Sequence, residues 1–394
     1  MNLLRRMSTV RLLALAGALA AVVLVAGIAV ARDRGGPKPP HRPLAQAIRN
    51  ALAATPVKGV SARITFTNHL FPSGSVSTGG GSALLNGATG RLWLSGDGRF
   101  RLELQSESGD TQIMGDGRSL RVYDASRATE YVLPLPRRGG AEASPVQRHA
   151  VPAMASISSA LTRLARAVDL SGAVPGDIAG RPVYSVRISP KHDGGLLGGL
   201  QLAWDAQRGV PLKVAVYSRG DTSPVLALTA TDVHYGTVSS ADLTVRPSAS
   251  TKVTRVTLPS PPSQAAEGRD RAHGAVSGAA AVAKRLPFRL AAPSTLVGLP
   301  RKTVRLLDAG GTKAAVLVYG KGLGAVVVLE QANSGSEGGD PLAGLPRVSI
   351  DGASGRELAT ALGTVLRFQR GGVTYTLLGS VPPVAAETAA RALS

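Results

Sequence analysis

Residues 98–124, GRFRLELQSESGDTQIMGDGRSLRVYD, contain the pattern that decides the fold. Phe100, Leu102 and Leu104 alternate with charged or polar residues, and Val122 continues the alternation after a Gly-Asp-Gly turn signal. A period of two places the apolar side chains on one face of a strand, and glycine with aspartate favours turns between antiparallel strands. The stretch therefore predicts β-hairpins that share one apolar face.

The same period extends through residues 44–258, on both sides of this stretch. Further strands are predicted at 60–66, 91–94, 183–188, 200–204, 212–217, 225–231 and 243–246. Two stretches instead have apolar residues three or four positions apart and predict amphipathic helices, at 43–54 and 151–169. We predict an α+β fold in which a curled antiparallel half-barrel of about ten strands is capped by helices and followed by a smaller C-terminal α+β domain.

The concave face of such a half-barrel is the expected binding surface. A sheet of about ten twisted strands curls, and two helices can cover only part of its inner face. The uncovered part is a candidate cavity for an apolar ligand. The candidate ligand-binding residues are the apolar side chains expected there: Phe100, Leu102, Leu104, Val122, Leu202, Trp204, Val214 and Val216. For Trp204, packing within the core is the alternative interpretation.

A second, smaller domain is predicted over residues 284–394, after a linker at 259–283 that is rich in Pro, Ala, Gly and Ser. Its expected strands are 303–308, 314–319, 324–330, 346–351, 364–370 and 373–379. Gly371-Gly372 favours a tight hairpin between the last two strands, and a terminal helix is predicted near 383–393.

The N-terminus predicts export. Leu12–Ala31 is a run of 20 uncharged residues, which gives about 30 Å of helix, and arginines precede it as an N-terminus held in the cytoplasm requires. Ala29-Val30-Ala31 is also a cleavage signal, so residues 1–31 are either an uncleaved membrane anchor or a signal peptide. Residues 32–43 predict a Pro/Gly-rich stalk. The remainder is expected at the outer face of the cytoplasmic membrane, or secreted if cleavage follows Ala31.

The charge of the chain does not favour nucleic acid as a partner. The 394 residues include 45 Lys+Arg against 25 Asp+Glu, a net charge of +20. This excess is divided as +6, +8 and +6 over residues 1–43, 44–258 and 259–394, and aromatic residues make up only 4%. Nucleic-acid sites concentrate charge on one face and stack bases on aromatic rings. A spread basic surface fits anionic lipid or cell-wall polymer at least as well.

The residue types and their spacing also argue against catalysis and metal binding. The chain has no Cys, which excludes disulfides, thiolate metal sites and lipid attachment at cysteine. No two of its six His lie within four residues of each other, and neither an H-E-x-x-H nor a G-x-S-x-G motif occurs. The closest carboxylate pairs, such as Glu103 with Glu107, lie in sequence typical of exposed strands and turns. We therefore expect no catalytic residue, no metal, no cofactor and no enzymatic activity.

Two motifs carry a resemblance to a known family. Phe100–Glu103 has the form F-R-x-E, and Asp116–Asp124 has the form D-G-x-x-L-x-x-Y-D. Together they resemble the LolA-like family of exported lipoprotein-carrier and lipoprotein-sorting proteins. Trp204-Asp205 and Gly209-Val210-Pro211 are similar to that family's later W-x-x-x-x-G-x-P hairpin. Sigma-factor regulatory proteins of the RseB/MucB type share this layout and add a C-terminal domain, and residues 284–394 are similar to small domains appended to such exported proteins in actinobacteria.

The resemblance implies a non-catalytic half-barrel that binds acyl chains of lipids or lipoproteins in its concavity. The RseB/MucB layout implies an alternative, a two-domain regulator that binds a membrane anti-sigma factor or another envelope protein. Carriers have an Arg-Pro pair where this chain has Ser95-Gly96, so the resemblance does not imply a lid held by that arginine. Carriers also diffuse freely, which an uncleaved anchor at Leu12–Ala31 would forbid.

Overall fold

The described chain forms two sheets, each with its own core. The computed structural model describes residues 36–71, 83–107, 109–135, 152–192, 194–256, 276–309, 312–333 and 344–393. The predicted membrane segment Leu12–Ala31 lies outside these ranges. Among the residues that the structure does describe, no helix is long and apolar enough to span a bilayer.

The first sheet and its helices occupy residues 44–255. The elements are α2 (Leu44–Ala53), β1 (Gly59–Asn68), α3 (Ala83–Asn86), β2 (Ala88–Ser95), β3 (Phe100–Ser106), β4 (Gly109–Gly115), β5 (Ser119–Asp124), β6 (Thr129–Pro134), α4 (Met154–Leu164), β7 (Val168–Leu170), β8 (Val174–Ile178), β9 (Arg181–Pro190), β10 (Leu197–Asp205), β11 (Pro211–Ser218), β12 (Leu226–Tyr235) and β13 (Lys252–Arg255). They follow the predicted order of helix, strands, helix and strands.

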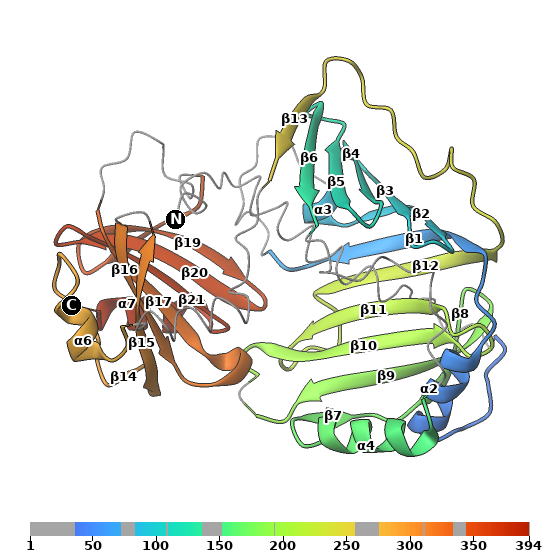
Figure 1. Cartoon of the computed structure of the whole chain (residues 1–394), viewed down its shortest axis with the longest axis horizontal. Coiled ribbons are helices and arrows are strands. Elements are labelled where there is room, and N and C mark those ends of the chain that lie inside the picture. The colour runs from blue at the N-terminus through green and yellow to red at the C-terminus, as the bar shows by residue number, and fades with distance from the viewer. Residues whose placement is uncertain are drawn as a thin grey trace.

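The thirteen strands form one curled sheet. The order is β13-β6-β5-β4-β3-β2-β1-β12-β11-β10-β9-β7, and β8 pairs with β9 beside this path. All neighbours are antiparallel except β13 and β6, which are parallel. Figure 1 shows β3–β6 standing steeply against β9–β12, with β1 lying alongside β12, so the sheet bends between β1 and β3. Twist that accumulates over so many strands produces this bend.

Several sequence predictions for this domain need correction. The sheet has thirteen described strands rather than about ten, because the sequence does not signal β4, β6, β7 and β8 clearly. The predicted strand at 243–246 is wrong, because Ser239 and Asp242 hydrogen-bond each other in a turn there and the last strand is β13. The helix predicted at 151–169 ends at Leu164, because residues 168–170 pair with β9 as β7.

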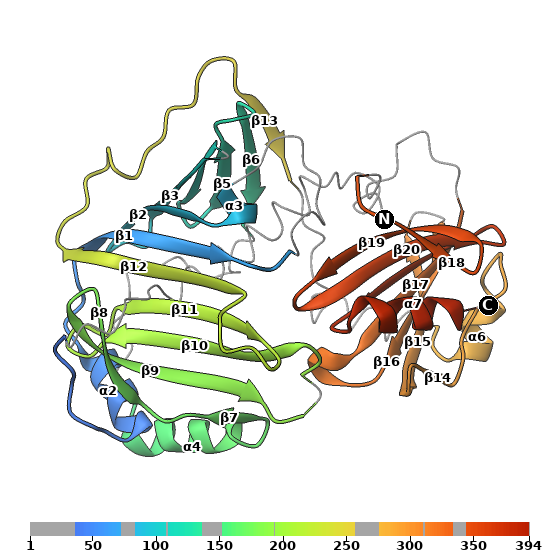
Figure 2. The ribbon, with the colours of Figure 1, turned by 180° about the vertical axis from the view of Figure 1, so that it is seen from behind.

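The second sheet has eight strands in the order β14-β15-β16-β17-β21-β20-β19-β18. Its elements are α6 (Ala279–Ala283), β14 (Thr295–Leu296), β15 (Leu299–Ala309), β16 (Thr312–Tyr319), β17 (Val326–Ala332), β18 (Arg347–Ile350), β19 (Ala353–Thr360), β20 (Gly363–Arg370), β21 (Val373–Gly379) and α7 (Pro383–Arg391). The sequence did not predict β14 and β19; β19 carries Gly355 and Glu357 at the buried positions where an alternating strand would have apolar side chains. Figure 2 shows α7 lying on one face of this sheet.

The second core begins before the predicted boundary at residue 284. Val282 in α6 is fully buried among the apolar residues of the second sheet, and Val276 packs against the same core. Residues 276–283 thus belong with this sheet rather than with the linker at 259–283, because their apolar side chains complete its core.

The two sheets touch at the hairpin between β9 and β10. The Ser380 hydroxyl accepts a hydrogen bond from the Leu196 backbone N–H at 2.9 Å. Nearby, the Ala361 N–H donates to the Leu70 carbonyl at 2.8 Å. These contacts join the ends of β10 and β1 to the turns that follow β19 and β21.

Candidate apolar binding site

The strand register places all eight candidate residues on the inner face of the first sheet. Val122 is directly paired with Ile113, and Ile113 is directly paired with Leu102. Leu102 is in turn aligned through β2 with β1. On the other side of β1, its residues are aligned with Leu228; Leu228 is directly paired with Val214, and Val214 with Leu202. Phe100, Leu104, Trp204 and Val216 occupy positions in phase with these pairs. This alignment places the side chains on one face; a role in ligand binding stays a prediction.

Four of these residues belong to a filled core in the upper half of the sheet. Leu102 and Leu104 are each 1% exposed, and Val122 is buried with them. Phe100 packs against the same core. The short helix α3 closes it with Ala83, and Asn68 holds α3 by donating a hydrogen bond to the Leu84 carbonyl at 2.6 Å. Leu102, Leu104 and Val122 are therefore buried in the core and Phe100 is partly buried, and their role in ligand binding stays a prediction.

Trp204 is buried beneath α2 at the lower end of the sheet. Its ring lies 6.3 Å from the ring of Tyr184, and both pack against Ala47 of α2. Tyr184 donates a hydrogen bond to the Pro40 carbonyl at 2.6 Å, which ties down the segment before the helix. The indole Nε1 of Trp204 has no hydrogen-bond partner among the described atoms. Trp204 is thus packed in a core cluster, and its contact with a ligand stays a prediction.

Between these two packed regions lies a row of partly exposed apolar side chains, which we call the apolar strip. It consists of Ile188 in β9, Leu200 in β10, Val216 in β11 and Leu226 in β12, each directly paired with the next, together with Leu202 beside them. Leu200 is 41% exposed and the other members are partly exposed. Val214, the neighbour of Leu202, is almost buried. Of the predicted residues, Leu202 and Val216 therefore reach this surface.

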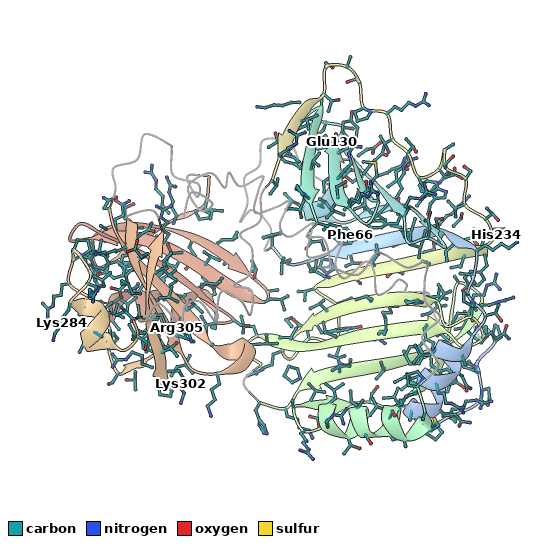
Figure 3. All side chains as sticks on the ribbon, viewed as in Figure 1. Phe66, Glu130, His234, Lys284, Lys302 and Arg305 are labelled. Carbon is teal, nitrogen blue, oxygen red and sulfur yellow. The ribbon has the colours of Figure 1, made fainter. Side chains whose placement is uncertain are left out.

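The strip ends at a polar hollow that the sequence did not predict. Leu226 pairs with Asn68 at the end of β1, and Asn68 lines an open hollow of about 610 Å³. We define the polar hollow by Asn68, His69, Thr89, Gln105 and Glu107, which line it together with Phe66. Thr65 pairs with Thr89 and Thr89 with Gln105, which places these side chains on the face opposite to Phe66 and Asn68. Phe66 is labelled in Figure 3 on β1. The one sequence signal is Asn68 itself, a polar residue at a position where the alternation of β1 calls for an apolar one.

A buried polar group lies where β10 and β12 end. The Asp205 carboxylate accepts a hydrogen bond from the Tyr235 hydroxyl at 2.7 Å and from the backbone N–H groups of Gln207 and Arg208. Burial and the neighbouring Asp205 charge raise the pKa of Tyr235, and the Arg181 guanidinium lies 5.1 Å from its ring centre. These groups satisfy one another, which is typical of a structural network.

The described residues offer no arrangement for metal chemistry. Within the ranges that the structure describes, no group of three or more His, Asp or Glu is placed to hold a metal ion. The inner face presents apolar side chains along the strip, and Asn68 lies at the end of the strip, where the hollow opens. Such a surface can hold an elongated apolar molecule that has a polar end.

The sequence matches no protein-family model and no curated protein. Among solved structures, MucB in complex with MucA(peri) is 18% identical over 88% of this chain and 94% of that chain, with a TM-score of 0.40. The MucA/MucB complex of Pseudomonas aeruginosa is 16% identical over the same shares of both chains, also with a TM-score of 0.40. A LolA-superfamily protein from Nitrosomonas europaea is 10% identical over 52% of this chain and 99% of that chain, with a TM-score of 0.22. The chain is thus similar to MucB and to LolA-superfamily proteins.

Proposed function

We propose that this chain is a non-catalytic, extracytoplasmic binding protein that holds an acyl chain of a lipid or lipoprotein along the apolar strip. The observation that carries the proposal is the row Ile188, Leu200, Val216, Leu226 and Asn68, one residue from each of five neighbouring strands. Four of its members are apolar and partly exposed, and the fifth opens into the polar hollow.

The dimensions of the row suit an acyl chain. Neighbouring strands lie about 4.8 Å apart, so four spacings span about 19 Å. Burying eight methylenes against the strip would contribute about 6 kcal/mol before the cost of ordering the chain. The strip alone is therefore expected to give a Kd no tighter than roughly tens of micromolar, because 1 μM corresponds to about 8 kcal/mol, and such binding is weak enough for a protein that later releases its ligand.

The polar hollow supplies the place for a headgroup. Asn68, at the end of the strip, carries an amide whose donor and acceptor also bond the Leu84 carbonyl and the Leu70 N–H. His69 lies beside Asn68, with Nδ1 3.3 Å from the Pro224 carbonyl oxygen. An ester or amide headgroup can exchange hydrogen bonds with these side chains while its acyl chain runs along the strip.

A fluorescent fatty acid, 11-(dansylamino)undecanoic acid, tests this proposal with the full chain. Leu200→Glu places a charge in the middle of the strip and is expected to weaken binding at least tenfold. Val174→Glu is the matched control, because Val174 is 48% exposed and pairs with Ser185 on the opposite face. Equal binding by both variants and the unchanged protein would contradict the proposal, as would no binding by the unchanged protein.

A two-domain regulator that binds a membrane anti-sigma factor or another envelope protein is the second candidate. The observation in its favour is that β10 connects the strip to the junction between the sheets. Leu200 lies four residues from Leu196, which contacts Ser380 of the second domain. An acyl chain on the strip could therefore change the junction. Crosslinking in the native host separates the two functions: a captured anti-sigma factor supports the regulator, and captured lipoproteins alone support the carrier.

We propose that the chain acts outside the cytoplasm, with Leu12–Ala31 as its membrane attachment. The apolar length of that segment and the arginines before it support this placement. Intact-mass measurement of the mature protein distinguishes an anchored receptor from a diffusible carrier cleaved after Ala31.

A further inference from the structure

The segment before α2 is held on the first sheet at two points. Tyr184, which is 2% exposed on β9, donates its hydroxyl hydrogen bond to the Pro40 carbonyl at 2.6 Å. Four residues earlier, the Gly36 backbone lies so close to the Asp177 carboxylate of β8 that an added Cβ would collide with it. Residues 36–43 include four prolines, which stiffen the segment and lower the entropy lost when it packs. The segment therefore follows the fold as far as Gly36.

Gly36 lies at one end of the first sheet, which we call the tethered end. It consists of the β8–β9 hairpin, the turn between β10 and β11, and the last turn of α2. The Ala206 N–H donates to the Pro182 carbonyl at 2.8 Å and joins the first two of these, while an added Cβ at Gly209 would meet the Ala51 carbonyl of α2. In Figures 1 and 2, α2 and β8 lie at one end of β9–β11 and the second sheet lies at the other.

Only a short covalent connection joins Gly36 to the proposed membrane attachment. The four residues 32–35 separate Gly36 from Ala31, the last residue of the apolar run Leu12–Ala31. Five steps between successive Cα atoms reach at most about 18 Å, even in a fully extended chain. With Leu12–Ala31 in a bilayer, the tethered end therefore stays within this distance of the end of the anchor.

Side chains exposed at the tethered end suit the surface of a bilayer. Leu52, in the last turn of α2, is 55% exposed. Arg208, in the turn between β10 and β11, and Lys58, just before β1, are exposed cations. A leucine flanked by basic side chains fits the headgroup region, where Lys and Arg favour anionic lipid. These contacts are secondary to the connection through residues 32–35, which by itself limits the distance.

We propose that the tethered end faces the membrane that holds Leu12–Ala31, within about 18 Å of it, and that the second domain points away from the membrane. The inference rests on the membrane attachment proposed above and is independent of acyl binding. β10 runs from Leu197, beside the junction with the second domain, to Asp205 at the tethered end, a length of about 26 Å. Leu200, in the apolar strip, lies about 17 Å from that end. A lipid bound on the strip has therefore left the bilayer.

The absence of cysteine allows the distance to the membrane to be measured from single labelled sites. In the full chain, Leu52→Cys carries a donor dye at the tethered end, and Val384→Cys carries the same dye on α7 of the second domain, where Val384 is 75% exposed. Both proteins are reconstituted into vesicles of phosphatidylcholine and phosphatidylglycerol that contain a headgroup-labelled acceptor lipid. If Leu52→Cys unfolds by circular dichroism, Gln207→Cys, at an exposed position in the turn between β10 and β11, replaces it.

The proposal predicts strong energy transfer to the lipid at position 52 and weak transfer at position 384. A flexible Gly-Ser linker of about 20 residues inserted between Gly35 and Gly36 should lower the transfer at position 52, whereas the same linker inserted between Ala265 and Ala266 should not. Equal transfer at both positions, or no change after the insertion at Gly36, would overturn the inference while the chain still floats with the vesicles. A full chain that does not float with vesicles would overturn the membrane attachment as well. Acyl binding to the strip is measured without vesicles and stands or falls separately.

Discussion

Glu330 sets a pH dependence on the stability of the second domain. It lies on β17, is fully buried, and faces the core beside Val328. One carboxylate oxygen accepts a hydrogen bond from the Ala291 N–H at 3.0 Å, and the other has no partner among the described atoms. Burial raises the pKa of Glu330 to about 7, against the smaller opposing effect of that hydrogen bond.

The direction and size of the effect follow from this pKa. Below pH 4.5 the carboxyl is protonated in both the folded and the unfolded chain, so its ionisation does not lower the free energy of unfolding. As the pH rises from 4.5 to about 7, only the unfolded chain ionises, and stability falls. Above that range the penalty levels off at about 3 kcal/mol, since each pKa unit corresponds to about 1.4 kcal/mol. Glu330→Gln removes the penalty and should stabilise the second domain at pH 8 while changing little at pH 4.

Urea unfolding at several pH values measures this. Both tryptophans, Trp93 and Trp204, lie in the first sheet, so tryptophan fluorescence follows that sheet alone and circular dichroism follows both. The gain from Glu330→Gln should therefore be visible by circular dichroism and not by fluorescence. Glu107→Gln, at an exposed position, is the control and should show no pH-dependent gain. A gain that is the same at pH 4 and pH 8 would refute the reasoning.

Three further predictions concern the first sheet and can be measured by urea unfolding followed by tryptophan fluorescence. Leu102→Ala leaves a cavity in a core where Leu102 is 1% exposed, and it should cost about 2–5 kcal/mol; a cost under 1 kcal/mol would mean that the core is not packed as described. Gly209→Ala should cost about 1 kcal/mol or more, because Gly209 has φ +67° and an added Cβ would meet the Ala51 carbonyl at the end of α2; an unchanged midpoint would contradict this contact. Asp205→Ala should cost about 1–3 kcal/mol by leaving the Tyr235 hydroxyl without its acceptor, whereas Asp221→Ala, at an exposed position, should cost less.

Period-two alternation predicted the strands that have one buried face and one solvated face. Residues 60–66, 100–105 and 120–123 alternate clearly and lie within observed strands. β4 was not predicted because Ile113 and Met114 are adjacent apolar residues, which breaks the alternation, although both are buried. The parallel pairing of β13 with β6 could not be predicted, because it depends on a contact between segments more than a hundred residues apart.

The shared face of the candidate residues follows from alternation, but their exposure does not. Leu102 and Leu202 have the same pattern in sequence, yet Leu102 lies in a filled core and Leu202 is a partly exposed member of the apolar strip. The difference comes from which helix or loop covers each part of the sheet, and this is a tertiary property. Trp204 illustrates the same limit, since α2 covers it. The position of the polar hollow at the end of the strip could not be predicted without knowing the register of β1 with β12, which pairs Asn68 with Leu226.

Site-mapped photocrosslinking tests the central claim most directly. The full chain is loaded with a diazirine fatty acid, irradiated and digested, and the modified residues are identified by mass spectrometry. The account predicts adducts concentrated on the apolar strip, at Leu200, Val216 and Leu226, and their loss in Leu200→Glu. Adducts that are absent, or that concentrate on the opposite face of the same strands at residues such as Gln201, would contradict it.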